Sequence, residues 1–206
     1  MVRQAVVLAG GMGKRLGALT ADTPKPLLNI GGRPFIEYLK DELTRHGIRR
    51  LILLVGPHFA AFDLAIRSPA WHDVDVELIA DQPAAGTAGA LRYAKHLLDP
   101  QFLIINGDTF FDINLLDPFL GDGTVKIALR EVKDTSRYGG VTINEGRVCT
   151  FGEKSSSGPG LINAGVYCLR RDVLDIIGDG SVSLETETLP QLVERGTVQG
   201  RVYDGP

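Results

Sequence analysis

The stretch "VVLAGGMGKRLGALTADTPKPLLNIGGRPF", from Val6 to Phe35, begins as an apolar strand and then breaks into glycine. Short continuous apolar runs are typical of strands in a sheet that is covered on both faces. In an open α/β sheet, the loop after the first strand lies at the carboxyl edge, where ligands bind. The stretch therefore predicts an α/β fold with a binding loop directly after its first strand.

The remainder of the chain extends this pattern. Apolar strands are expected at 4–9, 49–56, 74–80 and 101–107. Helices are expected at 34–46, 59–67 and 87–98. Beyond residue 107 we expect strands and hairpins, with a turn at Glu145-Gly146, and then a helix over 183–196 that Ser183 or Thr186 caps. The predicted fold is a Rossmann-like, doubly wound mixed sheet in three α/β/α layers.

Length and composition indicate one domain over 1–206, with functional halves at about 1–110 and 111–206. The formal net charge of −3 argues against a general nucleic-acid binder. We expect a cytoplasmic protein, because no stretch looks like a signal peptide or a membrane span. Cys149 and Cys168 lie in apparent strands without metal-type spacing, and both are expected to be buried, reduced thiols.

Glycines at positions 10, 11 and 13 allow backbone N–H groups to approach phosphate oxygens, because no Cβ atom is in the way. Lys14 and Arg15 add charged donors for the same oxygens. Two familiar nucleotide motifs do not fit: a P-loop needs Ser or Thr where Arg15 stands, and a dinucleotide fingerprint needs glycine where Leu16 stands. The glycines alone leave a plain tight turn open.

Lys25 strengthens the phosphate interpretation. It stands between Pro24 and Pro26, which restrict the backbone on both sides and so fix where the lysine points. A lysine held in this way favours phosphate contact over surface decoration.

The whole segment 8–38, "LAGGMGKRLGALTADTPKPLLNIGGRPFIEY", resembles the opening signature of the sugar-1-phosphate nucleotidylyltransferases, with Lys14 in place of the usual threonine. The resemblance continues through "QPAAGTAGAL" (82–91), "FLIINGDTFFDINL" (102–115), "RYGGV" (137–141), "FGEK" (151–154) and "GLINAGVYCL" (160–169). It thus covers nearly the whole chain. Within the family, the chain is most similar to the D-glycero-α-D-manno-heptose 1-phosphate guanylyltransferases.

The resemblance implies a role for each motif. The implied nucleotide-binding residues are Leu8, Ala9, Gly10, Gly11, Gly13, Lys14, Gln82, Gly86 and Thr87, of which the last three would read the base edge. The implied sugar-phosphate-binding residues are Gly139, Gly140, Glu153, Lys154, Asn163 and Gly165. The implied catalytic residues are Arg15, Lys25 and Asp108, and Asp108 is the expected Mg²⁺ ligand. Asp112 is expected to be a turn residue or to support the site from behind its ligand-contacting residues.

The resemblance implies transfer of a nucleotidyl group from a nucleoside triphosphate to a sugar 1-phosphate, with release of pyrophosphate. GTP and the heptose phosphate are the expected pair, and mannose 1-phosphate with GTP or N-acetylmuramate 1-phosphate with UTP are the alternatives. The expected partners are these small molecules, not nucleic acid or a membrane, and the residues leave homo-oligomer formation open.

The family usually continues past "VYDGP" into a strand with a second metal-binding aspartate, so the C-terminus is expected to be cut short at Pro206. This gap motivates a rival of another class, a non-catalytic subunit that binds nucleotide or sugar phosphate. A glycosyltransferase ranks last, because Asp108-Thr109-Phe110 lacks the second acid of a D-x-D motif.

Overall fold

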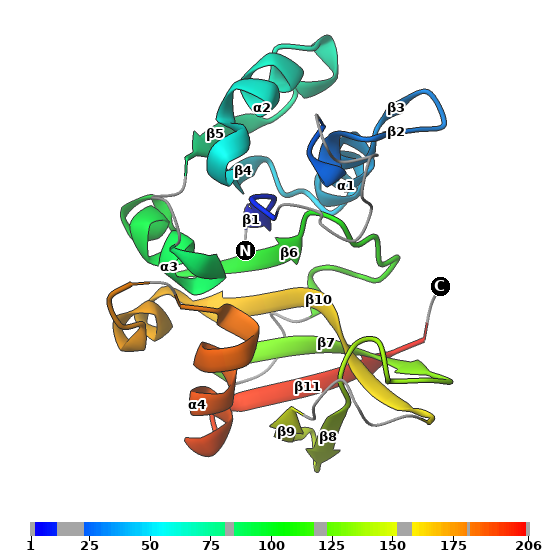
Figure 1. Cartoon of the computed structure of the whole chain (residues 1–206), viewed down its shortest axis with the longest axis vertical. Coiled ribbons are helices and arrows are strands. Elements are labelled where there is room, and N and C mark those ends of the chain that lie inside the picture. The colour runs from blue at the N-terminus through cyan, green and yellow to red at the C-terminus, as the bar shows by residue number, and fades with distance from the viewer. Residues whose placement is uncertain are drawn as a thin grey trace.

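The computed structural model describes residues 3–11, 23–80, 85–117, 123–151, 158–180 and 182–204. Within them, nine strands form one sheet in the order β5-β4-β1-β6-β10-β7-β11-β9-β8 (Figure 1). The strands are β1 (Gln4–Leu8), β4 (Arg50–Leu54), β5 (Asp75–Ile79), β6 (Gln101–Asn106), β7 (Val125–Val132), β8 (Val141–Asn144), β9 (Arg147–Phe151), β10 (Gly160–Arg170) and β11 (Val198–Tyr203). A separate small ribbon pairs β2 (Asn29–Ile30) with β3 (Arg33–Pro34).

The described residues contain four α-helices, namely α1 (Phe35–Arg45), α2 (Phe59–Ile66), α3 (Gly86–Tyr93) and α4 (Leu189–Glu194). Short 3-10 helices are η2 (Lys25–Leu27), η3 (Gly56–His58), η4 (Pro69–Trp71), η5 (Ala94–Leu97) and η7 (Arg171–Ile176), and η8 (Leu184–Thr188) is a π-helical turn. None of the helices described is long and apolar enough to cross a membrane.

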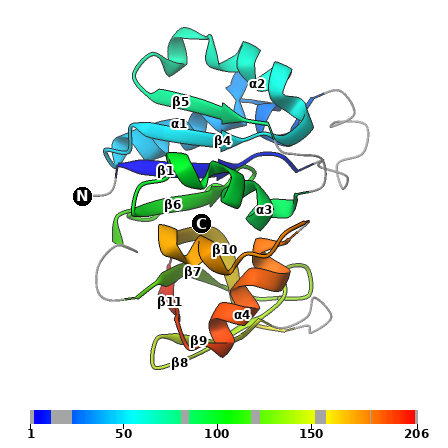
Figure 2. The same ribbon diagram turned by 90° about the vertical axis from the view of Figure 1, so that its left-hand side faces the viewer.

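Two apolar cores lie on the two faces of the sheet. Alternate residues of β1 enter opposite cores: Ala5 and Val7 join one, while Val6 joins the other. Helices α1 and α2 cover the first face, and α3, η7, η8 and α4 cover the second (Figure 2). The predicted three-layer α/β/α architecture is confirmed.

The sheet is mixed, as predicted. Strands β5, β4, β1 and β6 run parallel, whereas β10 is antiparallel to both β6 and β7. Strand β11 returns parallel to β7, with Val198 opposite Val125. The sequence analysis did not predict β11, because Gln199, Gly200 and Arg201 break any apolar run at its centre.

The predicted helix boundaries need two corrections. The segment predicted as one helix over 183–196 begins with the π-helical turn η8, whose cap is Ser183: its hydroxyl accepts from the Thr186 N–H at 3.1 Å. Thr186 is therefore inside the turn and is not the cap. The helix predicted at 87–98 is α-helical only to Tyr93 and continues as the 3-10 helix η5.

The prediction that both cysteines are buried holds for one of them. Cys168 is buried, and this burial raises the pKa of its thiol to about 12, so the thiol stays protonated. Cys149 is exposed, because β9 lies near the edge of the sheet and turns this side chain to solvent. The prediction of a buried thiol at Cys149 was wrong.

Candidate active site

The carboxyl ends of β1 and β6 meet at one edge of the sheet. Leu8, the last residue of β1, is opposite Asn106, the last residue of β6. Just beyond, the Gly107 N–H donates to the Leu8 carbonyl at 2.9 Å. The backbone of residues 8–11 and the side chain of Asp108 therefore leave the sheet side by side, at the edge where open α/β sheets bind ligands.

Lys25 and Asp108 form an ion pair at this edge. The Lys25 Nζ lies 2.6 Å from Asp108 Oδ2, although 83 positions separate the two residues in the sequence. The η2 turn fixes the backbone of Lys25. Pro24 occupies the N-cap of this turn, and the Leu27 N–H donates to the Pro24 carbonyl at 2.8 Å. The side chains of Lys25 and Asp108 are 37% and 44% exposed, so both remain accessible to a ligand.

Asp108 is available to hold a cation together with a ligand. No group of three or more His, Cys, Asp or Glu side chains gathers as a metal site among the described residues. The other ligands of a metal at Asp108 would include phosphate oxygens and water. This is the usual arrangement for Mg²⁺ in nucleotide sites, so the donor set fits a substrate-bridging ion.

Gly86 and Thr87, at the start of α3, are tied to the segment 182–184. The Ala88 N–H donates to the Val182 carbonyl, and the Val182 N–H donates to the Ala85 carbonyl, both at 3.0 Å. The Thr87 Oγ1 accepts from the Leu184 N–H at 2.8 Å. The Thr87 hydroxyl oxygen thus already has a partner within the protein, which gives this side chain a positioning role besides the base contact predicted for it.

We expect Thr87→Val to destabilise the protein by about 1–2 kcal/mol, because it leaves the buried Leu184 N–H without an acceptor. Thr87→Ser keeps the hydroxyl and should lose much less stability. Urea unfolding of the two variants measures the difference. Equal stability of the two variants would show that the hydroxyl bond does not matter to the fold.

A bulge in β10 brings the sugar-side motif next to β6. The register of β10 with β7 shifts between Asn163 and Tyr167, and Gly165 within this bulge has a φ of +75°. A Cβ atom at Gly165 would lie 2.8 Å from the Nδ2 of Asn106, two residues before Asp108. Only glycine therefore allows β10 to approach the end of β6 this closely.

Asn163 has partners on both ends of its amide. Its Oδ1 accepts from the Gly165 N–H at 2.9 Å, and its Nδ2 donates to the Tyr167 hydroxyl at 2.7 Å. The amide therefore holds the shape of the bulge, and one Nδ2 hydrogen remains for another acceptor.

Sequence reasoning missed Tyr167 and Glu185. Burial of Tyr167, and next the charge of Glu185, raise the pKa of this phenol far above its usual range, so the hydroxyl stays protonated and can donate to Glu185. Tyr167 is 0% exposed and stands in an apolar run, which made it look like ordinary core. Its hydroxyl links the β10 bulge to η8 and so to the segment that holds Thr87.

Gly139 and Gly140 precede β8 and approach the same bulge. Gly139 has a φ of +84°, and its N–H donates to the Thr135 carbonyl at 3.0 Å. Val141 pairs with Leu161 in antiparallel register, so the chain before Val141 runs along β10 towards Asn163. The structure thus gathers Gly139, Gly140, Asn163 and Gly165 on one side of the edge that carries Asp108.

Six of the predicted site residues lie outside the described residues, namely Gly13, Lys14, Arg15, Gln82, Glu153 and Lys154. Asp112 does not point to Asp108: its carboxylate pairs with Arg45 of α1 at 2.9 Å. It pins the chain after β6 to that helix.

The sheet order and the paired Lys25 and Asp108 at the carboxyl ends of β1 and β6 are those of an open α/β sheet whose ligand site lies at this edge. The family model described as nucleotidyl transferase matches residues 4–204. The chain belongs to this family, and it is an enzyme of sugar-1-phosphate nucleotidylyl transfer.

Among curated proteins, the chain is 32% identical over 173 residues to D-glycero-alpha-D-manno-heptose 1-phosphate guanylyltransferase of Campylobacter jejuni, over 84% of this chain and 78% of that protein. It is 34% identical over 200 residues to mannose-1-phosphate guanylyltransferase of Mycobacterium tuberculosis, over 93% of this chain and 56% of that protein.

Among solved structures, the chain is similar to HddC from Yersinia pseudotuberculosis, with a TM-score of 0.87 and 30% identity over 100% of this chain and 92% of that one. A second HddC structure, complexed with GMP-PN, matches with the same TM-score and 29% identity.

Proposed function

We propose that this enzyme transfers a guanylyl group from GTP to D-glycero-α-D-manno-heptose 1-phosphate, in a pathway that makes lipopolysaccharide or another cell-surface polysaccharide. The observation that carries the proposal is the Lys25–Asp108 pair at the joint edge of β1 and β6, with the β10 bulge beside it. The choice of base and sugar rests on the similarity to heptose 1-phosphate guanylyltransferases.

In the proposed reaction, a phosphate oxygen of the sugar 1-phosphate attacks the α-phosphorus of GTP in line. The new P–O bond forms as the bond from the α-phosphorus to the bridging oxygen breaks, and pyrophosphate leaves with the electron pair. Such a transfer needs positioning and charge neutralisation more than covalent help. Lys25 would supply positive charge to the reacting phosphates, and Arg15 would hold the outgoing pyrophosphate.

Mg²⁺ is the metal that we propose for Asp108. When bound, it would neutralise charge on the phosphate oxygens. In the structure Lys25 pairs with the Asp108 carboxylate at 2.6 Å. When nucleotide and metal bind, Lys25 would turn from the carboxylate to the phosphates.

We further propose that the two halves of one domain share this site. The nucleotide would lie on residues 8–11, 13, 14, 82, 86 and 87 of the first half, and the sugar phosphate on Gly139, Gly140, Glu153, Lys154, Asn163 and Gly165 of the second. The enzyme would act in the cytoplasm, where nucleoside triphosphates are made, and cell fractionation checks this.

Pyrophosphate release with panels of nucleotides and sugar phosphates tests the substrate pair. We expect release from GTP with the heptose phosphate, in preference to GTP with mannose 1-phosphate, UTP with N-acetylmuramate 1-phosphate, and CTP with glucose 1-phosphate. The last pair is included because a glucose-1-phosphate cytidylyltransferase of Salmonella typhimurium is 28% identical over 98% of this chain. A preference for any other pair would overturn the choice of substrates.

Chelation of divalent cations is expected to abolish release in the same assay, and added Mg²⁺ should restore it. The physical reason is that Lys25 carries a single positive charge, so a bound divalent cation would supply much of the charge neutralisation that the triphosphate needs. Full turnover in excess chelator would exclude the proposed metal. Tight nucleotide binding without release from any pair would favour a non-catalytic subunit.

A further inference from the structure

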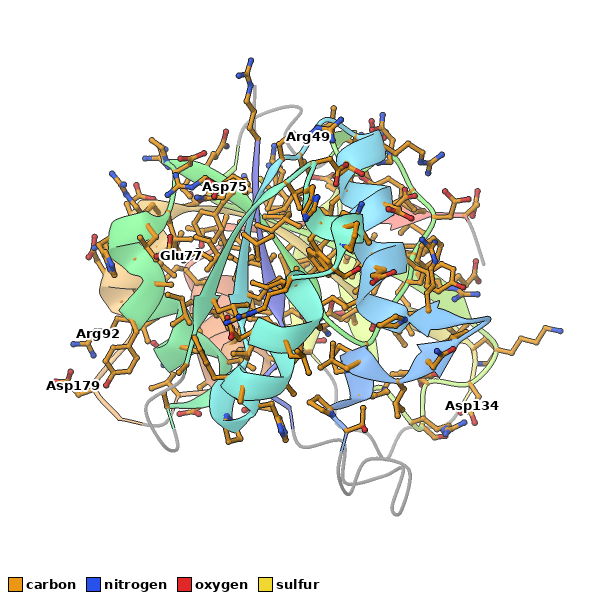
Figure 3. The ribbon with its side chains drawn as sticks, turned by 90° about the horizontal axis from the view of Figure 1, so that it is seen from above. Arg49, Asp75, Glu77, Arg92, Asp134 and Asp179 are labelled. Atoms are coloured by element: carbon orange, nitrogen blue, oxygen red, sulfur yellow. The ribbon has the colours of Figure 1, made fainter. Side chains whose placement is uncertain are left out.

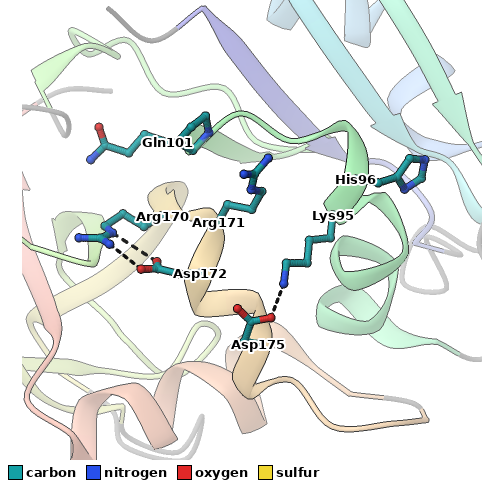
Figure 4. A pocket seen from close by; sticks show the side chains of 8 residues that line it. Lys95, His96, Gln101, Arg170, Arg171, Asp172 and Asp175 are labelled. Atoms are coloured by element: carbon teal, nitrogen blue, oxygen red, sulfur yellow. Dashed lines mark hydrogen bonds and ion pairs between the residues drawn. The ribbon is translucent and has the colours of Figure 1, made fainter.

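A cavity of about 750 Å³ opens on the sheet edge opposite to the proposed active site. Its lining includes Gln101, the first residue of β6, and Arg170, the last residue of β10 (Figure 4). Asp108 follows the other end of β6, so roughly 20 Å of strand separates the cavity from the Lys25–Asp108 pair. The cavity is thus distinct from the nucleotide site.

The lining is rich in cationic groups that come from both halves of the chain. Lys95 and His96 are supplied by η5, while Arg170 and Arg171 come from the end of β10 and the start of η7. Two carboxylates, Asp172 and Asp175, also line the cavity and are placed against Arg170 and Lys95 (Figure 4). Three basic side chains, Lys95, Arg170 and Arg171, therefore line the cavity together with two carboxylates.

Arg171 is the cation of the lining that pairs with neither of these carboxylates. Among the described residues, no carboxylate lies within ion-pair distance of its guanidinium, which donates to the Leu98 carbonyl at 2.7 Å. Its backbone N–H also donates, to the Pro100 carbonyl at 2.9 Å. Arg171 is thus anchored twice to the turn at 98–100 and keeps an unneutralised charge and several free N–H donors.

The turn at 98–100, which anchors Arg171, is itself held by Gln4 of β1. Gln4 is 0% exposed, and its amide donates to the Leu97 carbonyl at 2.9 Å and accepts from the Asp99 N–H at 2.7 Å. On the other side, Arg92 of α3 pairs with Asp179 at 2.5 Å and donates to the Gly178 carbonyl (Figure 3). These contacts fix the end of η5 to β1, and α3 to the segment after η7, so the cationic lining is pre-organised.

From this arrangement we propose that the cavity is a second ligand site, which binds the phosphate or diphosphate group of a small molecule through Arg171 and Lys95. The planar guanidinium suits phosphate oxygens, and the ammonium of Lys95 adds a point charge. The pairs Lys95–Asp175 and Arg170–Asp172 are exposed, so they hold their partners weakly and give way to a doubly charged anion. The volume suits a phosphorylated small molecule.

This proposal does not depend on the reaction at Asp108, and its test uses a local reporter. The imidazole of His96 lines the cavity, and its NMR resonances can be assigned by comparison with His96→Gln. The full chain is titrated with inorganic phosphate at constant pH and ionic strength, with chloride as the balancing anion. Phosphate that binds only at Lys25 is too far away to move these resonances.

We expect a saturable shift of the His96 resonances with half-saturation at roughly 1 mM, the affinity of a few charge-assisted bonds at an open site. The double variant Lys95→Gln, Arg171→Gln should weaken binding at least about tenfold. Lys95→Gln alone, which alters only an exposed pair, should weaken it less and guards against misfolding of the double variant. Arg67→Gln, in a comparable exposed pair on α2, should leave binding unchanged.

Pyrophosphate and GMP, titrated in the same way, distinguish a diphosphate ligand from a monophosphate ester. Tighter binding of pyrophosphate than of phosphate assigns the site to diphosphates, and tighter binding of GMP assigns it to phosphate esters. A linear, non-saturating shift overturns the proposal. So does unchanged half-saturation in folded Lys95→Gln and in the folded double variant.

Discussion

Asp108→Asn is expected to lower the rate of pyrophosphate release by about 10³-fold, while the protein remains folded. Charge stabilisation by a bound metal is worth several kcal/mol in a transition state, and each 1.4 kcal/mol corresponds to a factor of ten. Asparagine keeps the shape of the side chain but loses the negative charge that holds a cation. The loss should appear in kcat, and raised Mg²⁺ concentrations should restore little of it.

The fold should tolerate this substitution. Asp108 is 44% exposed, and among the described residues it forms one ion pair, with Lys25, which is 37% exposed. Pairs of this kind contribute about 0–1 kcal/mol to stability. Urea unfolding should therefore place Asp108→Asn within about 1 kcal/mol of the parent protein, which separates a catalytic defect from an unfolded one.

Asp112→Asn is the matched control. Asp112 stands four residues further along the same segment, is also exposed and also pairs with one cation, Arg45. It lacks the contact with Lys25, so its loss should change turnover by less than about twofold. Equal activity of the two variants, or an Asp108→Asn enzyme with an unchanged Mg²⁺ requirement, would place the metal elsewhere.

The sequence contained enough to predict strands β1, β4, β5 and β6 and to single out Lys25 and Asp108, whose side chains pair in the structure. Apolar runs marked β1, β4 and β6 because these strands are buried on both faces. Strand β5 lies at the edge of the sheet and is only partly buried, and its sequence alternates instead. The prolines around Lys25 indicated that its backbone is fixed, and the strand before Asp108 indicated that this carboxylate lies at the carboxyl edge of the sheet. Topology then brings the two together, since β1 and β6 are neighbours in the sheet.

The remaining features could not be predicted, because they depend on contacts between residues that are far apart in the sequence. Strand β11 is interrupted at its centre by Gln199, Gly200 and Arg201, and its pairing with β7 and β9 depends on segments far away in the sequence. The acceptor role of the Thr87 hydroxyl depends on Leu184, 97 residues away in the sequence. Tyr167 looks like any apolar core residue until the positions of Asn163 and Glu185 are known.

The π-helical turn η8 connects these unpredicted contacts. Its first residue, Leu184, donates to Thr87 beside the predicted nucleotide side, and its second, Glu185, faces Tyr167 behind the predicted sugar side. Isolated π-helical turns are rare in proteins, and those that occur often lie at functional sites. A substitution that disturbs the contact between Val182 and α3 should therefore affect both the predicted nucleotide side and the predicted sugar side of the site.

Gly86→Ala should disturb this contact and destabilise the protein by about 3 kcal/mol or more. Gly86 has a φ of +67°, and a Cβ atom there would contact the carbonyl oxygen of Val182 and lie 2.8 Å from its carbonyl carbon. The left-handed conformation alone costs an alanine about 1 kcal/mol. Val182 can retreat only by giving up its hydrogen bonds with Ala85 and Ala88, each worth about 1 kcal/mol.

Gly47→Ala separates the two causes. Gly47 has a similar φ of +78°, but a Cβ atom there has nothing within 4 Å, so this variant should lose only the conformational part, about 1 kcal/mol. Urea midpoints converted with a common slope measure the difference. Equal losses would mean that the contact with Val182 relaxes freely. At a temperature where both variants are folded, only Gly86→Ala should raise KM for the nucleotide and for the sugar phosphate together, because Val182 leads directly into η8.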